Sequence, residues 1–207
     1  MRVGVVDHGM GNLRSVAKAL EAAGAAVTVS ADRRELEGQE ALCVPGQGIF
    51  GRAVTNLDAA GLAGSIAAWI GDDRPFLGIC LGLQILFDES DERGPVGGLG
   101  ILPGRVVRLR GGPGVPVPHI GWNTVLADLD PGPGGADGDP PYFYFDHSYA
   151  VEPADRSIVA GWCDHGGRFC AAVRRRSILG VQFHPEKSGA AGIDLLRGWL
   201  DGATRSF

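Results

Sequence analysis

The stretch that decides the fold is Phe76-Leu77-Gly78-Ile79-Cys80-Leu81-Gly82, an apolar run that reaches a cysteine flanked by two glycines. An apolar run of this kind is typical of a buried strand, and the glycines indicate a tight turn into a following helix. A nucleophile elbow has this spacing of glycines around a nucleophile, which is held in strained backbone at the C-terminal edge of a sheet. Gly78 and Gly82 would remove side chains that collide across the bend. A core cysteine between packing glycines has the same local pattern, so this segment alone leaves both interpretations open.

Strand and helix patterns alternate on both sides of this stretch. Strand patterns lie at residues 2–7, 25–29, 41–44 and 75–79, and helix patterns lie at 13–24, 61–70 and 81–90. Strands that alternate with helices of these lengths predict a mostly parallel sheet covered by helices on both faces. The expected fold class is therefore α/β.

The character of the sequence changes after residue 100. Short strand patterns separated by glycine and proline lie at 104–109, 142–149, 157–163, 169–174 and 178–183, and an amphipathic helix pattern lies at 189–202. These patterns predict an antiparallel extension that makes the sheet a mixed one. The segment 130–141, rich in proline, glycine and aspartate, is expected to be an exposed insertion.

Composition limits the class of protein. The 207 residues fit one domain, 1–207, and the hydrophobic fraction of 44% and charged fraction of 21% are ordinary for a globular chain. The net charge of −5 and the scattered arginines create no field for a polyanion, so nucleic acid is not expected as a partner. There is no apolar run of about 18 residues and no signal-peptide pattern, so no membrane contact and a cytoplasmic location are expected.

The four cysteines, Cys43, Cys80, Cys163 and Cys170, include no CxxC pair and are expected to be free thiols. His165 lies between the last two, which suggests a metal site at first sight. Neither cysteine has ligand spacing, however, and buried thiols are the simpler interpretation. No metal and no cofactor is expected.

A cysteine nucleophile needs a base, and the segment Val181-Gln182-Phe183-His184-Pro185-Glu186 contains one. In an extended chain, residues two apart point to the same side about 6.6 Å apart, so His184 and Glu186 are expected to face one site. Pro185 favours extended backbone at His184. Alone, this segment could be a surface turn. Together with the elbow, it predicts a triad in which Cys80 is the nucleophile, His184 the base and Glu186 the group that orients the base.

The motifs GICLGLQ (78–84) and FHPE (183–186) resemble those of the class I, triad-type glutamine amidotransferases. Further segments are similar to the family of glutaminase subunits of imidazole glycerol phosphate synthases: DHGMGNLRSV (7–16), PGQGIF (45–50), GLGILPGRV (98–106), PHIGWN (118–123), YFDHSY (144–149) and GVQFHPEKSG (180–189). The similarity covers nearly the whole chain. Relatives that serve anthranilate, GMP or pyridoxal phosphate synthesis share the elbow and the HPE motif but not this set.

The resemblance implies a class I glutamine amidotransferase fold and two half-reactions. This chain would hydrolyse glutamine through a Cys80 thioester, and a partner (βα)8-barrel cyclase subunit would use the ammonia within a heterodimer. The products would be imidazole glycerol phosphate and an aminoimidazole carboxamide ribonucleotide, in histidine biosynthesis.

The resemblance also implies roles for individual positions. Glutamine binding is implied for Gly48, Gln84, His147, Ser148 and Tyr149, and an oxyanion hole for the backbone amides of Gln47 and Leu81. Contact with the cyclase is implied for Asn12, Trp122, Tyr144 and Lys187. Core aromatics at Trp122 and Tyr144 and a solvated lysine at Lys187 remain alternative interpretations of the last three positions. The chain departs from the family in carrying His8 where tyrosine is usual and Gln47 where valine is usual.

Other classes of protein fit the sequence less well. Gly9-Met10-Gly11 after a strand suggests dinucleotide binding, but the third glycine of that motif would fall at Arg14. A cysteine peptidase or deglycase of similar fold would share the elbow, but Gln84 and the HPE spacing argue against it. A regulatory module without activity would be expected to lack one member of the triad.

Overall fold

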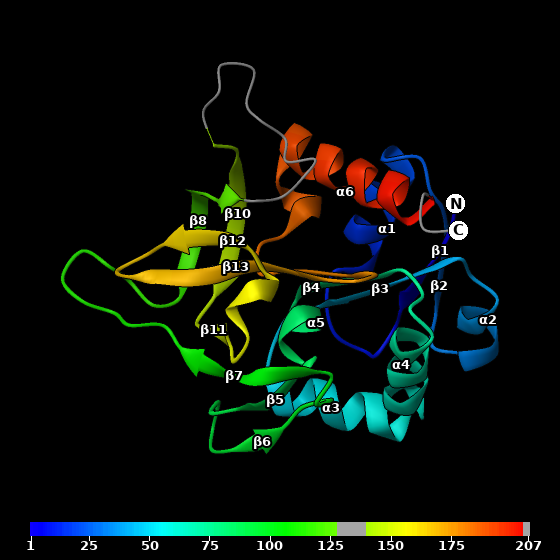
Figure 1. Ribbon diagram of the computed structural model, residues 1–207, viewed down its shortest axis with the longest axis horizontal. Coiled ribbons are helices and arrows are strands. Elements are labelled where there is room, and N and C mark those ends of the chain that lie inside the picture. The colour runs from blue at the N-terminus through cyan, green and yellow to red at the C-terminus, as the bar shows by residue number, and fades with distance from the viewer. Residues whose placement is uncertain (128–139, 205–207) are drawn as a thin grey trace.

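The computed structural model describes residues 1–127 and 140–204. In this part of the chain, twelve strands form one large sheet and two strands form a separate ribbon (Figure 1). The strands of the large sheet are β1 (Arg2–Val6), β2 (Ala26–Ser30), β3 (Ala41–Gly46), β4 (Phe76–Cys80), β5 (Phe87–Ser90), β6 (Val96–Gly97), β7 (Leu102–Arg108), β9 (Leu126–Ala127), β11 (Tyr149–Pro153), β12 (Val159–Asp164), β13 (Arg168–Arg175) and β14 (Ile178–Val181). The ribbon consists of β8 (His119–Thr124) and β10 (Tyr142–His147).

Helices cover both faces of the sheet. They are α1 (Leu13–Ala22), α2 (Arg33–Glu37), α3 (Phe50–Ala59), α4 (Leu62–Gly71), α5 (Leu81–Gln84) and α6 (Gly189–Thr204), with 3-10 helices η1 (Arg156–Ile158) and η2 (Pro185–Lys187). In Figure 1, α1 and α6 lie above the sheet, whereas α3 and α4 lie below it.

The strand order has a parallel half and an antiparallel half. Strands β2, β1, β3, β4 and β14 are neighbours in that order and run parallel. Beyond β14, the strands β13, β11 and β7 join as antiparallel neighbours, and β12 pairs antiparallel with β13. The predicted α/β class, with a mostly parallel sheet and an antiparallel extension in the C-terminal half, is confirmed.

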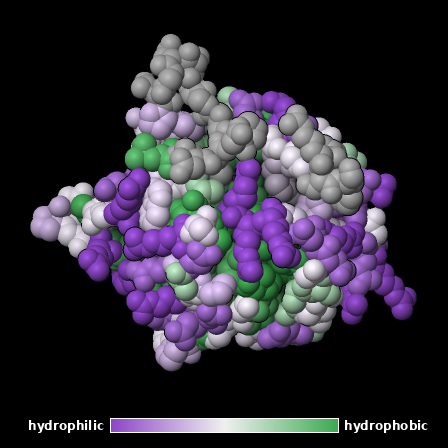
Figure 2. Space-filling view, viewed as in Figure 1, coloured by the Kyte–Doolittle hydropathy of each residue, from purple (hydrophilic) through white to green (hydrophobic). Residues whose placement is uncertain are grey.

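Two hydrophobic cores lie on opposite faces of the sheet. Neighbouring residues of β1 divide between them, because successive side chains of a strand point to opposite faces. Val5 packs in the core under α1 and α6, and Val6 packs in the core under α3 and α4. The face of the molecule shown in Figure 2 is largely hydrophilic, with hydrophobic surface gathered near its centre.

The turn after β4 packs directly on the backbone of β3. A Cβ atom at Gly82 would lie 1.8 Å from the carbonyl oxygen of Val44, and one at Gly78 would lie 2.6 Å from the carbonyl oxygen of Gly82. Both positions therefore require glycine, as the elbow pattern predicts. This close approach lets α5 begin at Leu81, immediately after Cys80.

One predicted helix is wrong. The helix expected over 81–90 ends at Gln84, and Phe87–Ser90 forms β5 instead, which pairs with β6 and β7. A short apolar run does not distinguish helix from strand by its periodicity, and pairing with β7, which is distant in sequence, decides between them here. Helices α2 and α3 were not predicted, although Phe50, Ala53 and Leu57 of α3 have the spacing of one helix face.

Two further expectations concern the surroundings of the domain. The expected insertion at 130–141 lies, up to residue 139, outside the described residues. Among the helices that the structure describes, none has the length and apolar character needed to cross a bilayer.

We expect Gly82→Ala to destabilise the protein by about 3 kcal/mol, because its methyl group cannot fit beside the Val44 carbonyl without moving backbone. Gly64→Ala is the matched control. Gly64 is exposed in α4, and nothing lies within 4 Å of its Cβ position, so this change should stabilise by about 0.5–1 kcal/mol. Urea denaturation of both variants measures the difference, and equal stabilities would contradict the tight packing at Gly82.

Candidate active site

Cys80 is the last residue of β4 and lies at the bend into α5. Its backbone angles, φ 52° and ψ −105°, fall in a region that residues other than glycine rarely adopt. The residue is only 5% exposed and lines a cavity of about 460 Å³. The strained turn thus presents the thiol to a cavity at the C-terminal end of a parallel strand.

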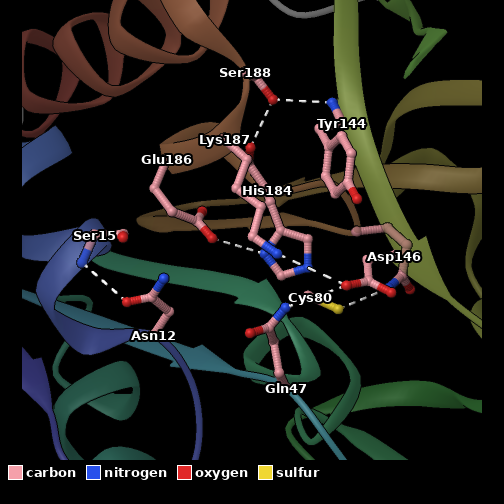
Figure 3. Close-up of polar contacts among 11 residues, drawn as sticks. Asn12, Ser15, Gln47, Cys80, Tyr144, Asp146, His184, Glu186, Lys187 and Ser188 are labelled. Atoms are coloured by element: carbon pink, nitrogen blue, oxygen red, sulfur yellow. Dashed lines mark hydrogen bonds and ion pairs between the residues drawn. The ribbon is translucent and has the colours of Figure 1, made fainter. Parts of the chain in front are cut away.

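His184 and Glu186 form a buried pair beside Cys80. Glu186 Oε1 lies 2.8 Å from His184 Nδ1, and the two side chains are 3% and 2% exposed (Figure 3). Nδ1–H therefore donates to the carboxylate, and Nε2 carries no proton while the ring is neutral. Nε2 is buried, and no described atom meets hydrogen-bond geometry with it. Cys80 nevertheless lies close enough to influence protonation of the ring, on the side away from Glu186 in Figure 3.

The backbone that brings this pair together differs from the prediction. His184 is extended, with φ −105° and ψ 95°, but Pro185–Lys187 forms the 3-10 turn η2 and not a continued extended chain. The backbone N–H of Lys187 donates to the His184 carbonyl oxygen at 3.0 Å and closes that turn. The two side chains meet as predicted, but the extended geometry invoked for Glu186 is wrong.

Hydrogen bonds on both sides fix the backbone of His184. Its N–H donates to the carbonyl oxygen of Tyr144 in β10 at 2.8 Å, and its own carbonyl accepts from Ser188 Oγ at 2.6 Å. The same Ser188 oxygen accepts from the N–H of Tyr144 at 3.0 Å (Figure 3). The imidazole is thereby tied to the ribbon of β8 and β10.

The protonation of the site follows from these contacts. Burial opposes a charge on His184, but the proximity of Cys80 and the hydrogen bond and charge of Glu186 outweigh burial and raise the pKa of His184 above its ordinary value. The positively charged, protonated form of the His184 ring is therefore favoured. The dipole of the following helix contributes little at Cys80, because α5 has only four residues.

The other three thiols lie in apolar surroundings. Burial raises the pKa of Cys43, and it raises the pKa of Cys163 and of Cys170 to about 12. These thiols therefore stay protonated at neutral pH and are poor nucleophiles.

The residues implied in glutamine binding and in the oxyanion hole all line the cavity at Cys80. They are Gln47, Gly48, Leu81, Gln84, His147, Ser148 and Tyr149. A larger hollow of about 810 Å³ lies over β7, β11 and β13 and is lined by none of them.

The backbone conformation explains why Gln47 and Gly48 line the cavity. Gly46, which pairs with Cys80 at the end of β3, places Gln47 beside the elbow. Gly48 has φ 118°, and a Cβ atom there would lie 2.5 Å from Met10 Cε, so both conformation and space favour glycine.

Sequence reasoning missed Gln182, which is fully buried next to Cys80. Its Nε2 lies 3.5 Å from Cys80 Sγ, and its Oε1 accepts from Gln84 Nε2 at 3.1 Å. The period of two residues that singled out His184 also applies to Gln182, two positions earlier. That signal could have found it.

His147 has a defined tautomer. Its Nδ1–H donates to the carbonyl oxygen of Tyr149 at 2.9 Å, so its Nε2 accepts from His119 Nδ1–H at 3.2 Å. His119 Nε2 in turn accepts from Asn123 Nδ2 at 3.3 Å. Burial lowers the pKa of His147 to about 3. Burial, together with nearby His165, lowers the pKa of His119 to about 4.

A family model described as glutamine amidotransferase class-I matches residues 4–200 of the chain. The chain belongs to the class-I glutamine amidotransferase family. Within that family it is similar to proteins named imidazole glycerol phosphate synthase subunit HisH. The protein of that name from Rhodopirellula baltica is 46% identical over 93% of this chain and 94% of its own, and that from Geobacillus kaustophilus is 45% identical over 98% and 97%.

Solved structures agree on the fold of this amidotransferase. A crystal structure of a glutamine amidotransferase superposes with a TM-score of 0.76 at 22% identity and covers 98% of both chains. The structure of PurLQS from Thermotoga maritima superposes with a TM-score of 0.70 at 21% identity, over 97% of this chain and 98% of that one.

Two of the four residues implied to face a cyclase, Trp122 and Tyr144, lie on the ribbon. Trp122 is 56% exposed, which excludes a core role, and its ring meets the half-buried ring of Tyr144 edge-on at 6.1 Å. Lys187 lies over the Tyr144 ring at 5.3 Å, and its Nζ lies 3.7 Å from Asp146 Oδ2. Asn12 is exposed, and its side chain caps α1 by accepting from a backbone N–H.

The two departures from the family pattern also have visible contacts. His8 is buried, and its Nε2–H donates to the carbonyl oxygen of Pro45 at 2.7 Å, which fastens the loop after β1 to the end of β3. Gln47 Nε2 lies 3.5 Å from Asp146 Oδ2, so this side chain reaches from the elbow to the ribbon (Figure 3).

We expect His119→Gln to weaken the dependence of stability on acid pH. The folded pKa of His119 is about 4, against an ordinary value of 6.5, so between those values the unfolded chain binds a proton that the folded chain does not. The contribution of neutral His119 to the free energy of unfolding is therefore fully present above about pH 6.5 and is lost as the pH drops toward 4. Replacing the ring should remove up to roughly 3 kcal/mol of that loss. Urea midpoints of both proteins at pH 7 and pH 4.5 measure the effect, and parallel losses would contradict it.

Proposed function

We propose that this chain hydrolyses glutamine to glutamate and ammonia through a thioester on Cys80. The ammonia passes to a cyclase subunit that makes imidazole glycerol phosphate and an aminoimidazole carboxamide ribonucleotide in histidine biosynthesis. Relatives that match over nearly their whole length carry the name of an imidazole glycerol phosphate synthase subunit, which supports this function. The chain acts as one domain over 1–207, in the cytoplasm.

One observation carries the proposal. A buried cysteine held in strained backbone lines a cavity, and a buried imidazole–carboxylate pair lies beside it. Acyl transfer needs this combination, because the thiolate is the nucleophile and the imidazolium holds the proton that the leaving group requires.

The first half of the reaction forms the thioester. The Cys80 thiolate attacks the side-chain amide carbon of glutamine, and the carbonyl electron pair moves to oxygen. The backbone amides of Leu81 and Gln47 hold that oxyanion, and such donors are commonly worth about 3 kcal/mol each. When the C–N bond breaks, His184 gives its proton to the nitrogen, so ammonia leaves and a glutamyl thioester remains.

The second half hydrolyses the thioester. Neutral His184 removes a proton from water while the water oxygen attacks the thioester carbon. The C–S bond then breaks, its electron pair returns to the sulfur of Cys80, and glutamate leaves. Glu186 stays ionised throughout and acts through His184, whose orientation and charge it stabilises.

Glutamine recognition is constrained by hydrogen bonds that already exist. Both protons of the Gln84 amide are used, one by the Tyr149 carbonyl at 2.9 Å and one by Gln182 Oε1 at 3.1 Å. Gln84 is therefore left with its oxygen, an acceptor, for the ammonium or amide N–H groups of glutamine. His147, Ser148, Tyr149 and Gly48 complete the pocket.

The ribbon is the surface best suited to the cyclase subunit. Its outward side carries Ile120, Trp122 and Tyr142, which are 56–59% exposed, and exposed aromatic and aliphatic groups are typical of protein interfaces. Lys187 and Asn12 lie on the same side of the molecule as Cys80 and His184, as the close-up in Figure 3 shows. A relative from Arabidopsis thaliana, named imidazole glycerol phosphate synthase hisHF, matches this chain over only 34% of its length, which supports a partner of larger size.

Cys80→Ala should abolish glutaminase activity, by at least about a thousandfold, because no other thiol lines the cavity. The assembled pair should still work with an added ammonium salt. Cys163→Ala is the matched control and should keep glutaminase activity, since Cys163 is buried away from the cavity. Glutamate release and cyclase turnover measure the two activities. Loss of ammonia-dependent turnover in Cys80→Ala would sink the assignment.

A glutamine-like diazo ketone should label Cys80 and spare the three other cysteines. Burial holds those thiols in the protonated form, as their raised pKa values indicate. Mass spectrometry of the labelled peptides reports the sites directly. Equal labelling of Cys43 or Cys170 would count against Cys80 as the nucleophile.

Glu186→Gln should lower glutaminase turnover less than His184→Ala does. A neutral amide can still accept the Nδ1–H bond but cannot steady the imidazolium, whereas loss of the ring removes the proton carrier itself. We expect a loss of about a hundredfold for the first variant and of more than a thousandfold for the second. Steady-state kinetics of both folded variants measure these losses. An unchanged turnover in Glu186→Gln would reject the orienting role of Glu186.

A further inference from the structure

Gln182 is a fully buried amide whose two ends face different partners. Its Nε2 lies 3.5 Å from Cys80 Sγ, and its Oε1 lies 3.1 Å from Gln84 Nε2. Burying an amide is unfavourable unless its polar atoms are paired, so this arrangement needs partners at both ends. One of those partners is the sulfur that the proposed reaction uses.

The orientation of this amide is settled by a chain of hydrogen bonds that starts at a backbone carbonyl. The oxygen of Tyr149 can only accept, so the Gln84 atom that lies 2.9 Å away is the NH2 group. The same NH2 group faces the Gln182 side chain, whose nearer atom must therefore be its oxygen. The Gln182 NH2 group is left to face Cys80.

The Tyr149 carbonyl, at which this series of hydrogen bonds begins, has no free acceptor site. It also accepts from His147 Nδ1–H at 2.9 Å, so both of its lone pairs are used. A rotation of the Gln182 amide would place its oxygen against the sulfur and two NH2 groups against each other. The surroundings thus permit a single orientation.

A thiol and a thiolate differ greatly as acceptors. The neutral thiol of Cys80 accepts a hydrogen bond weakly, whereas the thiolate accepts a charge-assisted bond about twice as strong. A donor held at the sulfur therefore stabilises the ionised form selectively. This matters here because α5, with four residues, offers only a short helix dipole.

We propose that Gln182 is a positioning residue that donates its amide N–H to the Cys80 thiolate, with its orientation set by Gln84. This inference rests on the proposed role of Cys80. It assigns Gln182 two effects: it holds the thiolate before attack, and it accommodates the electron pair that returns to sulfur when the thioester breaks. The sulfur remains the atom that forms and breaks bonds, and Gln182 transfers no proton.

The test is the pH dependence of Cys80 alkylation by iodoacetamide in the full-length chain. Gln182→Met keeps the length and burial of the side chain but removes the donor. The midpoint of the alkylation profile should rise by about one to two pH units, which is the range expected for a lost hydrogen bond to a charged group. The titratable and charged groups around the sulfur are the same in both proteins. They are His184 and, through it, Glu186, together with those that line the cavity of Cys80: Glu92, Arg93, Arg108, Asp146 and His147.

Gln182→Glu is the second variant, since it keeps the shape and replaces the donor with a carboxylate oxygen. Its profile should move in the same direction and at least as far. Gln84→Met leaves Gln182 in place but frees its amide to rotate, so a smaller upward shift is expected. These two variants keep the proposal testable if Gln182→Met does not fold.

The result separates this inference from the proposed function. A folded Gln182→Met protein with an unchanged alkylation midpoint would overturn the role of Gln182, even if glutamine hydrolysis fell through a packing defect. A shifted midpoint supports it whether or not the wild type releases glutamate from glutamine. Gln39→Met is the matched control and should leave the midpoint unchanged, because the half-buried Gln39 precedes β3 whereas Cys80 pairs with Gly46 at the opposite end of that strand.

Discussion

The contact between the turn at Cys80 and the backbone of β3 is the constraint on which the rest of the site depends. The Val44 carbonyl leaves no room for a side chain at Gly82, and the turn can pass only in a strained conformation, with Cys80 at φ 52°. Such strain costs on the order of 1–3 kcal/mol and persists only where the surrounding structure over-determines it. Two cores on opposite faces of the sheet provide that surrounding structure.

A second requirement is that polar groups buried around the thiol have partners. The parallel half of the sheet contributes the elbow, whereas the antiparallel half and the ribbon contribute the acceptors that orient its neighbours. The Tyr144 carbonyl holds the backbone of His184, and the Tyr149 carbonyl holds the amide of Gln84 and the ring of His147. The site therefore lies where the two halves of the fold meet, and each half alone would leave buried groups unpaired.

Some of the site was recognisable from residue types and spacing, and some was not. Cys80, His184 and Glu186 could be named because an elbow and an HPE segment each have a short local pattern, although the second closes through a 3-10 turn and not an extended chain. Gln182 shares the two-residue spacing of His184 and Glu186, but that spacing does not show what a buried amide contacts. The orientation of its amide is set by Gln84 and Tyr149, which lie 98 and 33 positions away in the chain.

By itself, the sequence determined the α/β class, the parallel half and the requirement for glycine at the elbow, and it singled out Cys80, His184 and Glu186 as the proposed nucleophile, base and orienting carboxylate. These depend on local backbone sterics and on periodicities of two and 3.6 residues, which a single segment contains. Only the tertiary structure decided that Phe87–Ser90 is a strand and that the Gln182 amide points its N–H at Cys80. The reason is physical: strand pairing and the orientation of a buried amide are set by hydrogen bonds to residues distant in sequence, and no local pattern contains those partners.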